Sequence, residues 1–476
     1  MRRSIVVFEL NEVPWEILDD YVAARPTSAL ARVLARSRCY MSMAADLGHL
    51  SPWTTWPTLH RGVNDEQHMI ASFGEDRRRA DQQFPPIWTL LRAAGASVGV
   101  CGTLHSYPAP EDLGHYAFYL PDAFASEPVA HPPELVDFQR FNLAMSRESG
   151  RNVDTHIAKK DALRVVRHSR RLGIRPTTYV ALGKQLLAER RRPAMSNRRR
   201  TYQSVLLFDI FARQLRRSQP QFSTFFTNHV ASAMHRYWAA HRPEDYERLG
   251  LGQDWIETFH DEVMWATGQA ADMVERLADY VDANPGSQLW IASSMGQRAT
   301  MAEGLETQLY LTHPAGFLDA MGLPGDDAWE QRPAMLPQFN LVVEDEYVEP
   351  FFDALRTVRV GGEPLHFRRS DNGFFSLDFG QANLHDQPDA VTIAGEARPI
   401  ASLGLETVEI EDRSDTTAYH VPEGILAVYD PASPPPDNGS RPEVSVLEVA
   451  PTLLKILGVE PPAYMARPKT LAELLV

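Results

Sequence analysis

Residues 84–108 have the sequence FPPIWTLLRAAGASVGVCGTLHSYP, and this stretch decides the fold class. Apolar residues recur at helical spacing over 86–94, and Gly95 stands where such a helix would end. The run VGVC at 98–101 follows after a short turn and has the character of a buried strand. A helix that leads directly into a buried strand indicates a parallel α/β sheet.

The same alternation extends in both directions along the chain. We expect further strands at 5–10, 222–228 and 288–292, and helices at 14–21, 255–280 and 446–457. The predicted fold class is therefore α/β, with a mostly parallel central sheet flanked by helices on both faces.

Two segments interrupt this alternation, and they divide the chain. We expect a first part of the core at 1–149, a basic helical insertion at 150–217, a second part of the core at 218–304, a small α+β cap at 305–415 and a C-terminal part of the core at 416–476. The insertion contains two Arg triplets, at 190–192 and 198–200. It is either a solvated helical segment or a lid that faces phosphate or another polyanion.

The composition and the net charge of the chain limit the kinds of molecule that it could bind. The 476 residues are 44% hydrophobic and 23% charged, as in an ordinary globular protein. The net charge of −15 argues against a uniformly cationic surface for nucleic acid or anionic membranes, although local basic patches stay open. We expect no nucleic-acid partner and no membrane span, because no stretch reaches roughly 20 apolar residues.

The N-terminus and the cysteines favour the cytoplasm. Residues 4–8 follow MRR and are too short for the apolar region of a signal peptide, so they fit a first buried strand. Only Cys39 and Cys101 are present, which gives neither a disulfide framework nor a CxxC metal site.

Polar residues follow several predicted strands. They are Asn11-Glu12, Asn228-His229, Ser293-Ser294 and His420. Ligands of open α/β sheets gather beyond the carboxyl ends of strands, so these places could converge on one site. The alternative for each residue alone is a cap or a turn hydrogen bond.

Five segments in order resemble one family. Residues 84–108 are similar to an "IWxLLxxAGxxVGV…YP" pattern, and 51–70 (SPWTTWPTLHRGVNDEQHMI) resemble a nucleophile segment. Residues 235–238 (HRYW) resemble the end of "DxxxHxxW", and WIASSMGQ at 290–297 stands where "SDHG" is expected. Residues 419–426 (YHVPEGIL), with VAPTLL at 449–454, resemble the closing motifs. The chain thus resembles the type I phosphodiesterase/nucleotide pyrophosphatase group of the alkaline phosphatase superfamily.

The resemblance implies two divalent metals, usually zinc, and a Thr or Ser nucleophile. His235 and His420 fall on metal histidines of the family, so we expect them to bind a metal. Other ligand positions are changed: Asn11 replaces the aspartate of "LDG", with Glu9 and Glu12 as neighbours, and Ala231, Ser294 and Met295 replace three more ligands. The resemblance therefore implies at most one divalent ion, zinc by preference, and not a two-metal mechanism.

The same comparison with the family motifs suggests which residue is the nucleophile and which residues surround it. Pro52 occupies the family's nucleophile position, and a small register change gives Thr54, with Thr55 in reserve. Glu9 and Asn11 share a strand face and are assigned catalytic roles. We expect Asn228, His229 and Ser294 to bind substrate.

We therefore expect a hydrolase or transferase that acts on a small anionic phosphoric or sulfuric ester, of the phosphodiesterase type, with a reduced or rebuilt metal site. Two alternatives stay open. One is a pseudoenzyme that binds an anionic ligand or a partner protein without turnover. The other is a metal-free enzyme in which Glu9 or His229 acts as general base.

Overall fold

The computed structural model describes residues 3–48, 50–148, 159–325, 327–334, 338–370, 372–380, 391–410, 413, 416–433 and 440–475. Residues 150–158 of the expected insertion and 381–390 of the expected cap lie outside this described part. Within it, no helix is long and apolar enough to cross a membrane.

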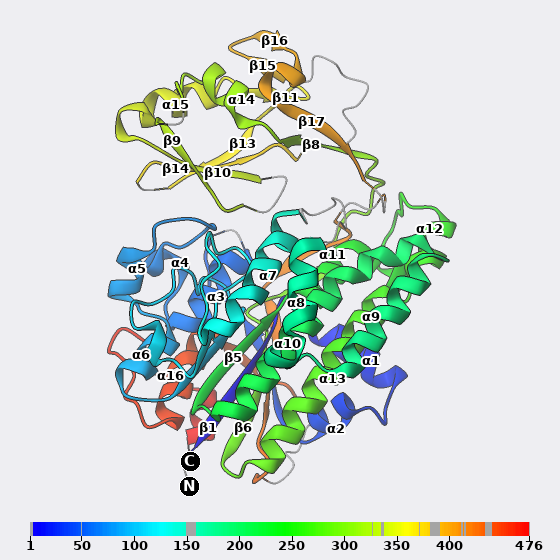
Figure 1. Ribbon diagram of the computed structural model, residues 1–476, viewed down its shortest axis with the longest axis vertical. Helices are drawn as coiled ribbons and strands as arrows, with labels where there is room; N and C mark the ends of the chain where they lie inside the picture. The colour runs from blue at the N-terminus through cyan, green and yellow to red at the C-terminus, as the bar shows by residue number, and fades with distance from the viewer. Residues whose placement is uncertain are drawn as a thin grey trace.

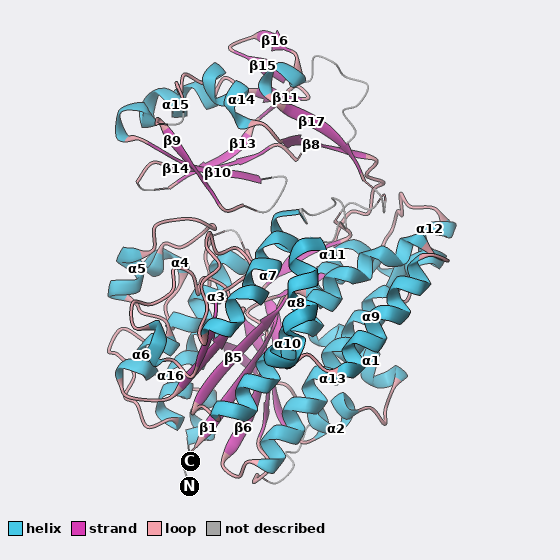
Figure 2. Ribbon diagram, in the orientation of Figure 1, coloured by secondary structure: helices cyan, strands magenta, loops and turns pink. Residues whose placement is uncertain are grey.

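The centre of the molecule is an eight-stranded sheet with the order β20-β2-β19-β6-β1-β5-β3-β4 (Figure 2). Strand β1 (Ser4–Leu10) pairs in parallel with β5 (Phe222–Thr227) and β6 (Ser287–Ala292). Strands β3 (Val98–Cys101) and β4 (Phe118–Leu120) continue in parallel beyond β5. On the other side β19 (Glu423–Tyr429) runs antiparallel to β6 and to β2 (Ser37–Met43), and β20 (Glu443–Ser445) closes the edge.

Both faces of this sheet are covered by helices. In β1, Val6, Phe8 and Leu10 belong to one buried cluster, whereas Ile5 and Val7 belong to the other, as the two-residue period of a strand requires. The first face carries α1 (Trp15–Ala24), α2 (Ala29–Ala35), α10 (Arg199–Ser218), α11 (His229–His241) and α13 (Glu262–Ala283). The second carries α3 (Pro52–Arg61), α6 (Ile87–Ala93) and α16 (Val449–Ile456). The predicted α/β class is confirmed.

Two expected helices are shorter than predicted. The segment 255–280 is not continuous: α12 (Gln253–Phe259) ends before α13 begins, and the break lets Phe259 stack on Tyr237 with ring centroids 4.7 Å apart. The segment 446–457 begins with a 3₁₀ turn, η7 (Val446–Glu448), before α16. Apolar periodicity did not reveal either boundary, because the apolar residues on both sides of each break are buried.

The helical segment between β4 and β5 comprises α7 (Val136–Glu148), α8 (Lys159–Leu172), α9 (Pro176–Glu189), η3 (Pro193–Arg198) and α10. Helix α10 packs Phe208 and Phe211 against Phe225 of β5, with ring centroids 5.2 and 5.0 Å away. The segment is therefore joined to the sheet through aromatic core contacts.

The described residues of 307–409 have a core of their own, which includes Leu341, Phe351 and Phe375, and we call this segment the cap. Its strands are β8 (Thr307–Leu311), β9 (Trp329–Arg332), β10 (Gln338–Val343), β11 (Arg359–Val360), β12 (Glu363–Pro364), β13 (His366–Arg369), β14 (Phe374–Asp378), β15 (Val391–Ile393), β16 (Glu396–Arg398) and β17 (Leu405–Glu409), with helices α14 (Pro314–Ala320) and α15 (Val348–Leu355). Figure 1 shows the cap beyond the carboxyl ends of β1 and β5.

Shorter elements complete the core. A two-stranded ribbon joins β7 (Gly296–Ala299) to β18 (Ala418–Val421) and pairs His420 with Gln297. The remaining helices of the core's second face are α4 (Asp65–His68) and α5 (Arg78–Gln83).

Candidate active site

The polar residues that follow β1 and β5 meet at the carboxyl edge of the sheet. Asn11 and Glu12 follow β1, and Asn228 follows the neighbouring parallel strand β5. Helix α11 begins directly after Asn228 and carries His235, and β18 adds His420. Parallel pairing therefore brings together residues that are far apart in sequence, at the edge where α/β sheets bind ligands.

Two histidines converge on one carboxylate oxygen. Oε2 of Glu12 lies 2.8 Å from Nε2 of His235 and 3.3 Å from Nε2 of His420. The ligand atoms of the three residues all lie within 4.8 Å of one another. It is the one group of three or more His, Cys, Asp or Glu side chains in the described chain with the spacing of a metal site.

The second nitrogen of each ring fixes its tautomer. Nδ1 of His235 donates to the carbonyl of Ala418 at 2.7 Å, and Nδ1 of His420 donates to that of Leu50 at 2.8 Å. A carbonyl oxygen only accepts, so in a neutral ring Nε2 carries a lone pair. Two lone pairs facing a carboxylate repel it, so the arrangement requires either protonated rings or a cation between the three groups.

Glu12 is held in place by strong constraints. Burial raises the pKa of its carboxyl, but the charges of His420 and His235 and their hydrogen bonds hold that pKa well below its ordinary range. Oε1 accepts from the Asn11 side chain at 2.7 Å, and Oε2 accepts from Gln297. The backbone of Glu12 has a φ of 58°, a left-handed conformation that costs a non-glycine residue about 1–3 kcal/mol.

Asn11 positions its neighbours. Its Oδ1 accepts from the indole N–H of Trp56 at 2.7 Å, and its amide nitrogen donates to both Glu12 and Asn228, each at 2.7 Å. These bonds fix the orientation of the Asn11 amide, which holds Oε1 of Glu12 while Gln297 holds Oε2.

A cavity of about 710 Å³ opens in front of these residues. The core contributes Glu12, Asn228, His235 and His420 to its wall, and the N-terminal end of α3 contributes residues 51–54. The helical segment contributes Arg200 and Gln203, and the cap contributes residues 366–368, Ser376 and Asp378. The cavity is large enough for a small organic ester.

The two candidate nucleophiles face different environments. Thr54 lines the cavity from the first turn of α3. The hydroxyl of Thr55 instead pairs with that of Ser294 at 2.8 Å, and both residues are fully buried away from the cavity wall. The structure therefore places Thr54, and neither Thr55 nor Ser294, at the cavity.

Glu9 lies beneath the site. Its Oε1 is 2.7 Å from Nε2 of His60, and both side chains are buried. The ring of His60 packs in turn on Trp56, with centroids 5.5 Å apart. Glu9 is thus on the Asn11 side of β1, as expected, but it does not line the cavity.

His229 lines the cavity but has both ring nitrogens engaged. Nε2 donates to the carbonyl of Ala266 at 3.1 Å, and Nδ1 accepts from the Thr227 hydroxyl at 2.6 Å. Burial lowers its pKa to about 4, so the ring is neutral near pH 7. A neutral ring with both nitrogens hydrogen-bonded does not have the geometry of a general base.

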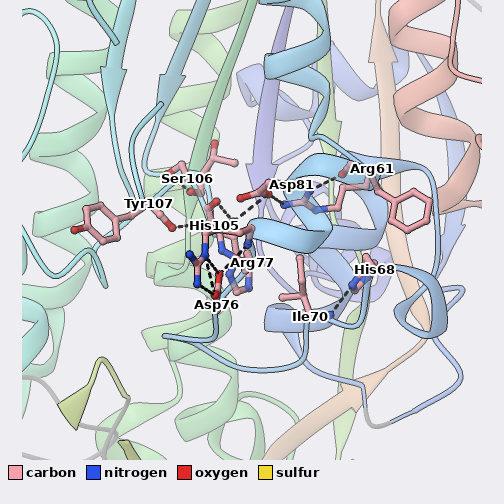
Figure 3. Close-up of polar contacts among 12 residues, drawn as sticks. Arg61, His68, Ile70, Asp76, Arg77, Asp81, His105, Ser106 and Tyr107 are labelled. Carbon is pink, nitrogen blue, oxygen red and sulfur yellow. Dashed lines mark hydrogen bonds and ion pairs between the residues drawn. The ribbon is translucent and has the colours of Figure 1, made fainter. Parts of the chain in front are cut away.

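A second polar network includes Arg77, His105 and Tyr107, which Figure 3 shows close together, and it contacts the start of α3. Arg77 donates to the carbonyls of His105, at 2.5 Å, and of Tyr107. The ring of His105 donates to the carbonyl of Trp53 at 2.8 Å, next to Thr54 in the first turn of α3. These bonds tie the loop after β3 to the helix end that carries Thr54.

The cap and the helical segment place cations around the cavity. Arg368 of the cap contacts Glu75 and Ser72 of the core, so the cap is joined to the core at the cavity rim. On the other side, Arg200 of α10 and Arg236 of α11 line the wall, and Arg236 is only 8% exposed. The wall opposite the cap therefore has positive charge suited to an anionic group.

The donor set fits a zinc ion. Two imidazoles and one carboxylate form the His₂Glu combination of catalytic zinc sites, which leave a fourth position open. Each histidine donates its other ring nitrogen to a carbonyl, which is the usual way such ligands are oriented. Glu12, His235 and His420 would hold the ion.

No protein-family model matches this sequence, and no curated protein sequence matches it. Among solved structures, murine ectonucleotide pyrophosphatase/phosphodiesterase 5 is similar over 99% of both chains, with 10% identity and a TM-score of 0.43. An inactive variant of it, in complex with AMP, has a TM-score of 0.42 at 10% identity. Phosphonoacetate hydrolase from Sinorhizobium meliloti, in complex with phosphonoformate, covers 96% of both chains at 12% identity, with a TM-score of 0.40.

The resemblance of the chain to the alkaline phosphatase superfamily rests on its sequence motifs. At these identities and scores we rest no argument about substrate or activity on the likeness, and the site is interpreted from its own geometry.

Sequence reasoning missed three residues of this arrangement. Glu12 was named among the polar residues that follow strands and as a neighbour of Asn11, but not as a metal ligand, because a glutamate at the glycine position of "LDG" gives no sign of its left-handed backbone. Gln297 and Trp56 were not assigned hydrogen bonds to the site. The pairing of β7 with β18 places Gln297 opposite His420, and that pairing is not visible in the sequence.

Proposed function

We propose that this chain is a phosphoric or sulfuric ester hydrolase or transferase of the phosphodiesterase type that uses one divalent cation, zinc by preference. The observation that carries the proposal is the convergence of the Nε2 atoms of His235 and His420 on Oε2 of Glu12, at the wall of a cavity that Thr54 also lines. A bound ion would supply Lewis-acid stabilisation of the anionic group under attack.

Thr54 is the proposed nucleophile. Its Oγ1 would form the new bond to phosphorus or sulfur while the bond to the ester oxygen breaks, and the alcohol would leave with a proton. Water would then release the group from Thr54 and restore the hydroxyl. Residues 51–54 begin α3, and the partial positive charge at the start of a helix favours an anion beside Thr54.

Other residues of the cavity would bind the substrate. Asn228 is exposed on the wall, and the bond from Asn11 fixes its side-chain oxygen, which orients its NH₂ group as a donor. Arg200 and Arg236 would bind further oxygens of the substrate, since guanidinium matches phosphate and carboxylate in two-point contacts. The cap would cover the substrate from the other side.

A single ion, and not a pair, is part of the proposal. Ser294 and Met295 occupy positions of second-metal ligands in the resembling motif, and both are fully buried outside the cavity wall. Ala231 is likewise buried and has no donor atom in its side chain.

The test begins with metal content. Purified protein is stripped with chelator, reconstituted with zinc or manganese and analysed by mass spectrometry, alongside a His235→Ala/His420→Ala variant. We expect one ion per chain in the wild type and none in the variant. The same preparations are then assayed with p-nitrophenyl phosphate, its phosphodiesters and its sulfate.

The outcomes separate the candidate functions. One bound ion with turnover supports the enzyme proposed here. One bound ion without turnover, together with affinity for the substrate analogues, favours the pseudoenzyme. If turnover persists after chelation and in the His235→Ala/His420→Ala variant, metal-free chemistry is favoured. If the reconstituted wild type contains no bound ion, the proposed metal site is refuted.

A further inference from the structure

Exposed apolar side chains gather on two consecutive helices. Among the described residues, eight large hydrophobic side chains are exposed, and five of them lie on α8 and α9. They are Leu163, Val166, Val180, Leu186 and Leu187, with exposed fractions from 47% to 70%. We call these five side chains and the cations among them the α8–α9 surface.

The spacing of these residues places them on outer stripes of their helices. Leu163 and Val166 are three residues apart on α8, while Val165 and Leu172 on the same helix are buried. Val180 and Leu187 are seven residues apart on α9 and so share a face. Helix α8 therefore buries apolar residues on one side and exposes others, whereas the buried residues of α9 are Thr178, Gln185 and Glu189 and its exposed ones include Val180 and Leu187.

The charge of this segment is opposite to that of the chain. Residues 159–192 hold 11 Lys or Arg and 2 Asp or Glu, a net charge of +9, whereas the whole chain carries −15. The rest of the chain therefore sums to −24. The exposed cations of the α8–α9 surface are Lys160, Arg164, Arg167, Arg170, Arg171, Lys184, Arg190, Arg191 and Arg192.

The outward side chains are not a result of loose packing. The Asp209 carboxylate of α10 accepts from the Thr178 hydroxyl at 2.6 Å and from the Arg175 backbone N–H at 3.0 Å, at the start of α9. At the other end of α9, Glu189 is buried and pairs with Arg199 at 2.7 Å. Both ends of α9 are thus fixed by buried carboxylates, and Val180 and Leu187 stay outside.

We propose that the α8–α9 surface docks on an anionic lipid bilayer. Apolar side chains among Lys and Arg, on helices that lie along a surface, are the pattern of interfacial membrane binding. The leucines and valines would enter the boundary between headgroups and acyl chains, while the cations reach lipid phosphates through their long stems. A bilayer needs no groove, and neither α8 nor α9 contributes a residue to the cavity of the candidate active site.

Docking would orient the rest of the molecule as well. The remaining chain carries −24 and would be repelled by an anionic bilayer, so binding would take place through this one surface. The proposal does not depend on the chemistry of the candidate active site and can fail or succeed without it.

The experiment is co-sedimentation of the full chain with vesicles of phosphatidylcholine alone or with about 30% phosphatidylserine. Two variants are compared with the wild type: Leu163→Ser/Val166→Ser/Val180→Ser/Leu187→Ser removes the apolar contribution, and Arg167→Gln/Arg171→Gln/Arg191→Gln removes charge. The matched control is Met301→Ser, which changes an exposed apolar residue (77%) outside this surface. Circular dichroism checks that every variant is folded.

We expect the wild type and Met301→Ser to bind the anionic vesicles and not the neutral ones. Each multiple variant should lose about tenfold or more in affinity, and added salt should weaken the binding. The proposal is overturned if the wild type does not sediment with anionic vesicles, or if the apolar variant binds as the wild type does. Binding to polyglutamate without binding to vesicles would overturn it in favour of an acidic protein partner.

Discussion

At the scale of single residues, the candidate site depends on which side chain supplies the carboxylate. Glu12 reaches both histidines from a left-handed backbone, whereas Asn11 and Gln297 hold that carboxylate without binding a cation themselves. Metal binding should therefore depend on residue 12 more than on any other acidic residue of β1 or its end.

Glu12→Gln should lose metal. The amide keeps the size of the side chain but removes the negative charge that the two imidazoles face. Zinc affinity should therefore fall at least about 100-fold. Glu9→Gln is the matched control, because Glu9 is a buried carboxylate on the same strand that contacts His60 instead. Titration of the metal-free proteins with zinc measures the zinc affinity of both variants. Equal affinities for the two variants would contradict the ligand assignment.

Thr54→Ala should abolish turnover of any ester that the wild type cleaves, with kcat lower by about 10³-fold or more, since the attacking hydroxyl is lost. Thr55→Ala removes a hydroxyl one residue away that is bonded to Ser294, outside the cavity wall. It should change kcat far less. Steady-state kinetics of both variants decide between the two residues, and the opposite order of effects would make Thr55 the nucleophile.

His229 should make folding sensitive to mild acid. Its pKa is about 4 in the folded chain because of burial, against an ordinary 6.5, so below pH 6.5 the unfolded chain binds a proton that the native ring refuses. Its contribution to stability is full above pH 6.5 and is lost as the pH falls toward about 4. At pH 5 the loss is about 2 kcal/mol. Urea unfolding from pH 7 to 5 should show a smaller loss for His229→Gln than for the wild type.

The histidines of the site could be predicted from sequence, but its carboxylate could not. His235 and His420 stand in motifs whose spacing survives, so both were proposed as ligands. The contribution of Glu12 depends on a φ of 58° and on contacts with residues more than 200 positions away, neither of which leaves a local pattern. Similarly, alternation in β1 placed Glu9 and Asn11 on one face but could not show that Glu9 pairs with His60.

At the scale of elements, the site depends on close backbone packing between β7, β18 and β19. A Cβ on Gly296 would lie 2.1 Å from the carbonyl oxygen of Glu423, so only glycine fits between β7 and the start of β19. Gly296 precedes Gln297, which donates to Glu12, and pairs with Val421, which follows His420. Packing of this ribbon and the position of the ligands are therefore linked.

Gly296→Ala should destabilise the fold by about 2 kcal/mol or more, because the added methyl group meets rigid backbone, and should also weaken zinc binding. Gly114→Ala is the control, since a Cβ at Gly114 meets no atom within 4 Å. Thermal unfolding with and without zinc measures both effects. A variant as stable as the control would show that the ribbon can move without cost.

The sheet could be predicted at this scale because its strands are short, apolar and separated by helices. The strand at 98–101 has the predicted bounds, and those at 5–10, 222–228 and 288–292 differ from the observed ones by a single residue at one end. Helix boundaries were less predictable. At the division between α12 and α13, Phe259 of α12 stacks on Tyr237 of α11, and a contact between two helices leaves no local pattern in the sequence.

At the scale of the whole molecule, the cap is joined to the core next to the cavity. Arg368 contacts Glu75 and Ser72, and the Asn340 amide donates to the carbonyl of Phe73 at 3.1 Å. Burial raises the pKa of Glu75, while Arg368 opposes that rise. The ion pair thus stabilises a carboxylate that would otherwise be costly to bury.

Arg368→Met should loosen the cap, because it leaves the buried Glu75 carboxylate without its cation. We expect faster hydrogen exchange at residues 71–75 and 366–370. Arg369→Met is the matched control, since Arg369 pairs with the exposed Glu349 within the cap. Exchange followed by mass spectrometry compares the two variants. Identical exchange in both would show that the Arg368 contact does not hold the cap.

The left-handed backbone of Glu12 also bears on which substitutions the site tolerates. An aspartate introduced at position 11 alone would put two carboxylates side by side, and their repulsion would disfavour the doubly ionised state. Replacement of Glu12 by glycine, taken alone, would relieve the backbone but remove the only carboxylate that faces His235 and His420 in the described chain. Each of these two substitutions is disfavoured by itself, so the effect of a substitution at position 11 should depend on the residue at position 12.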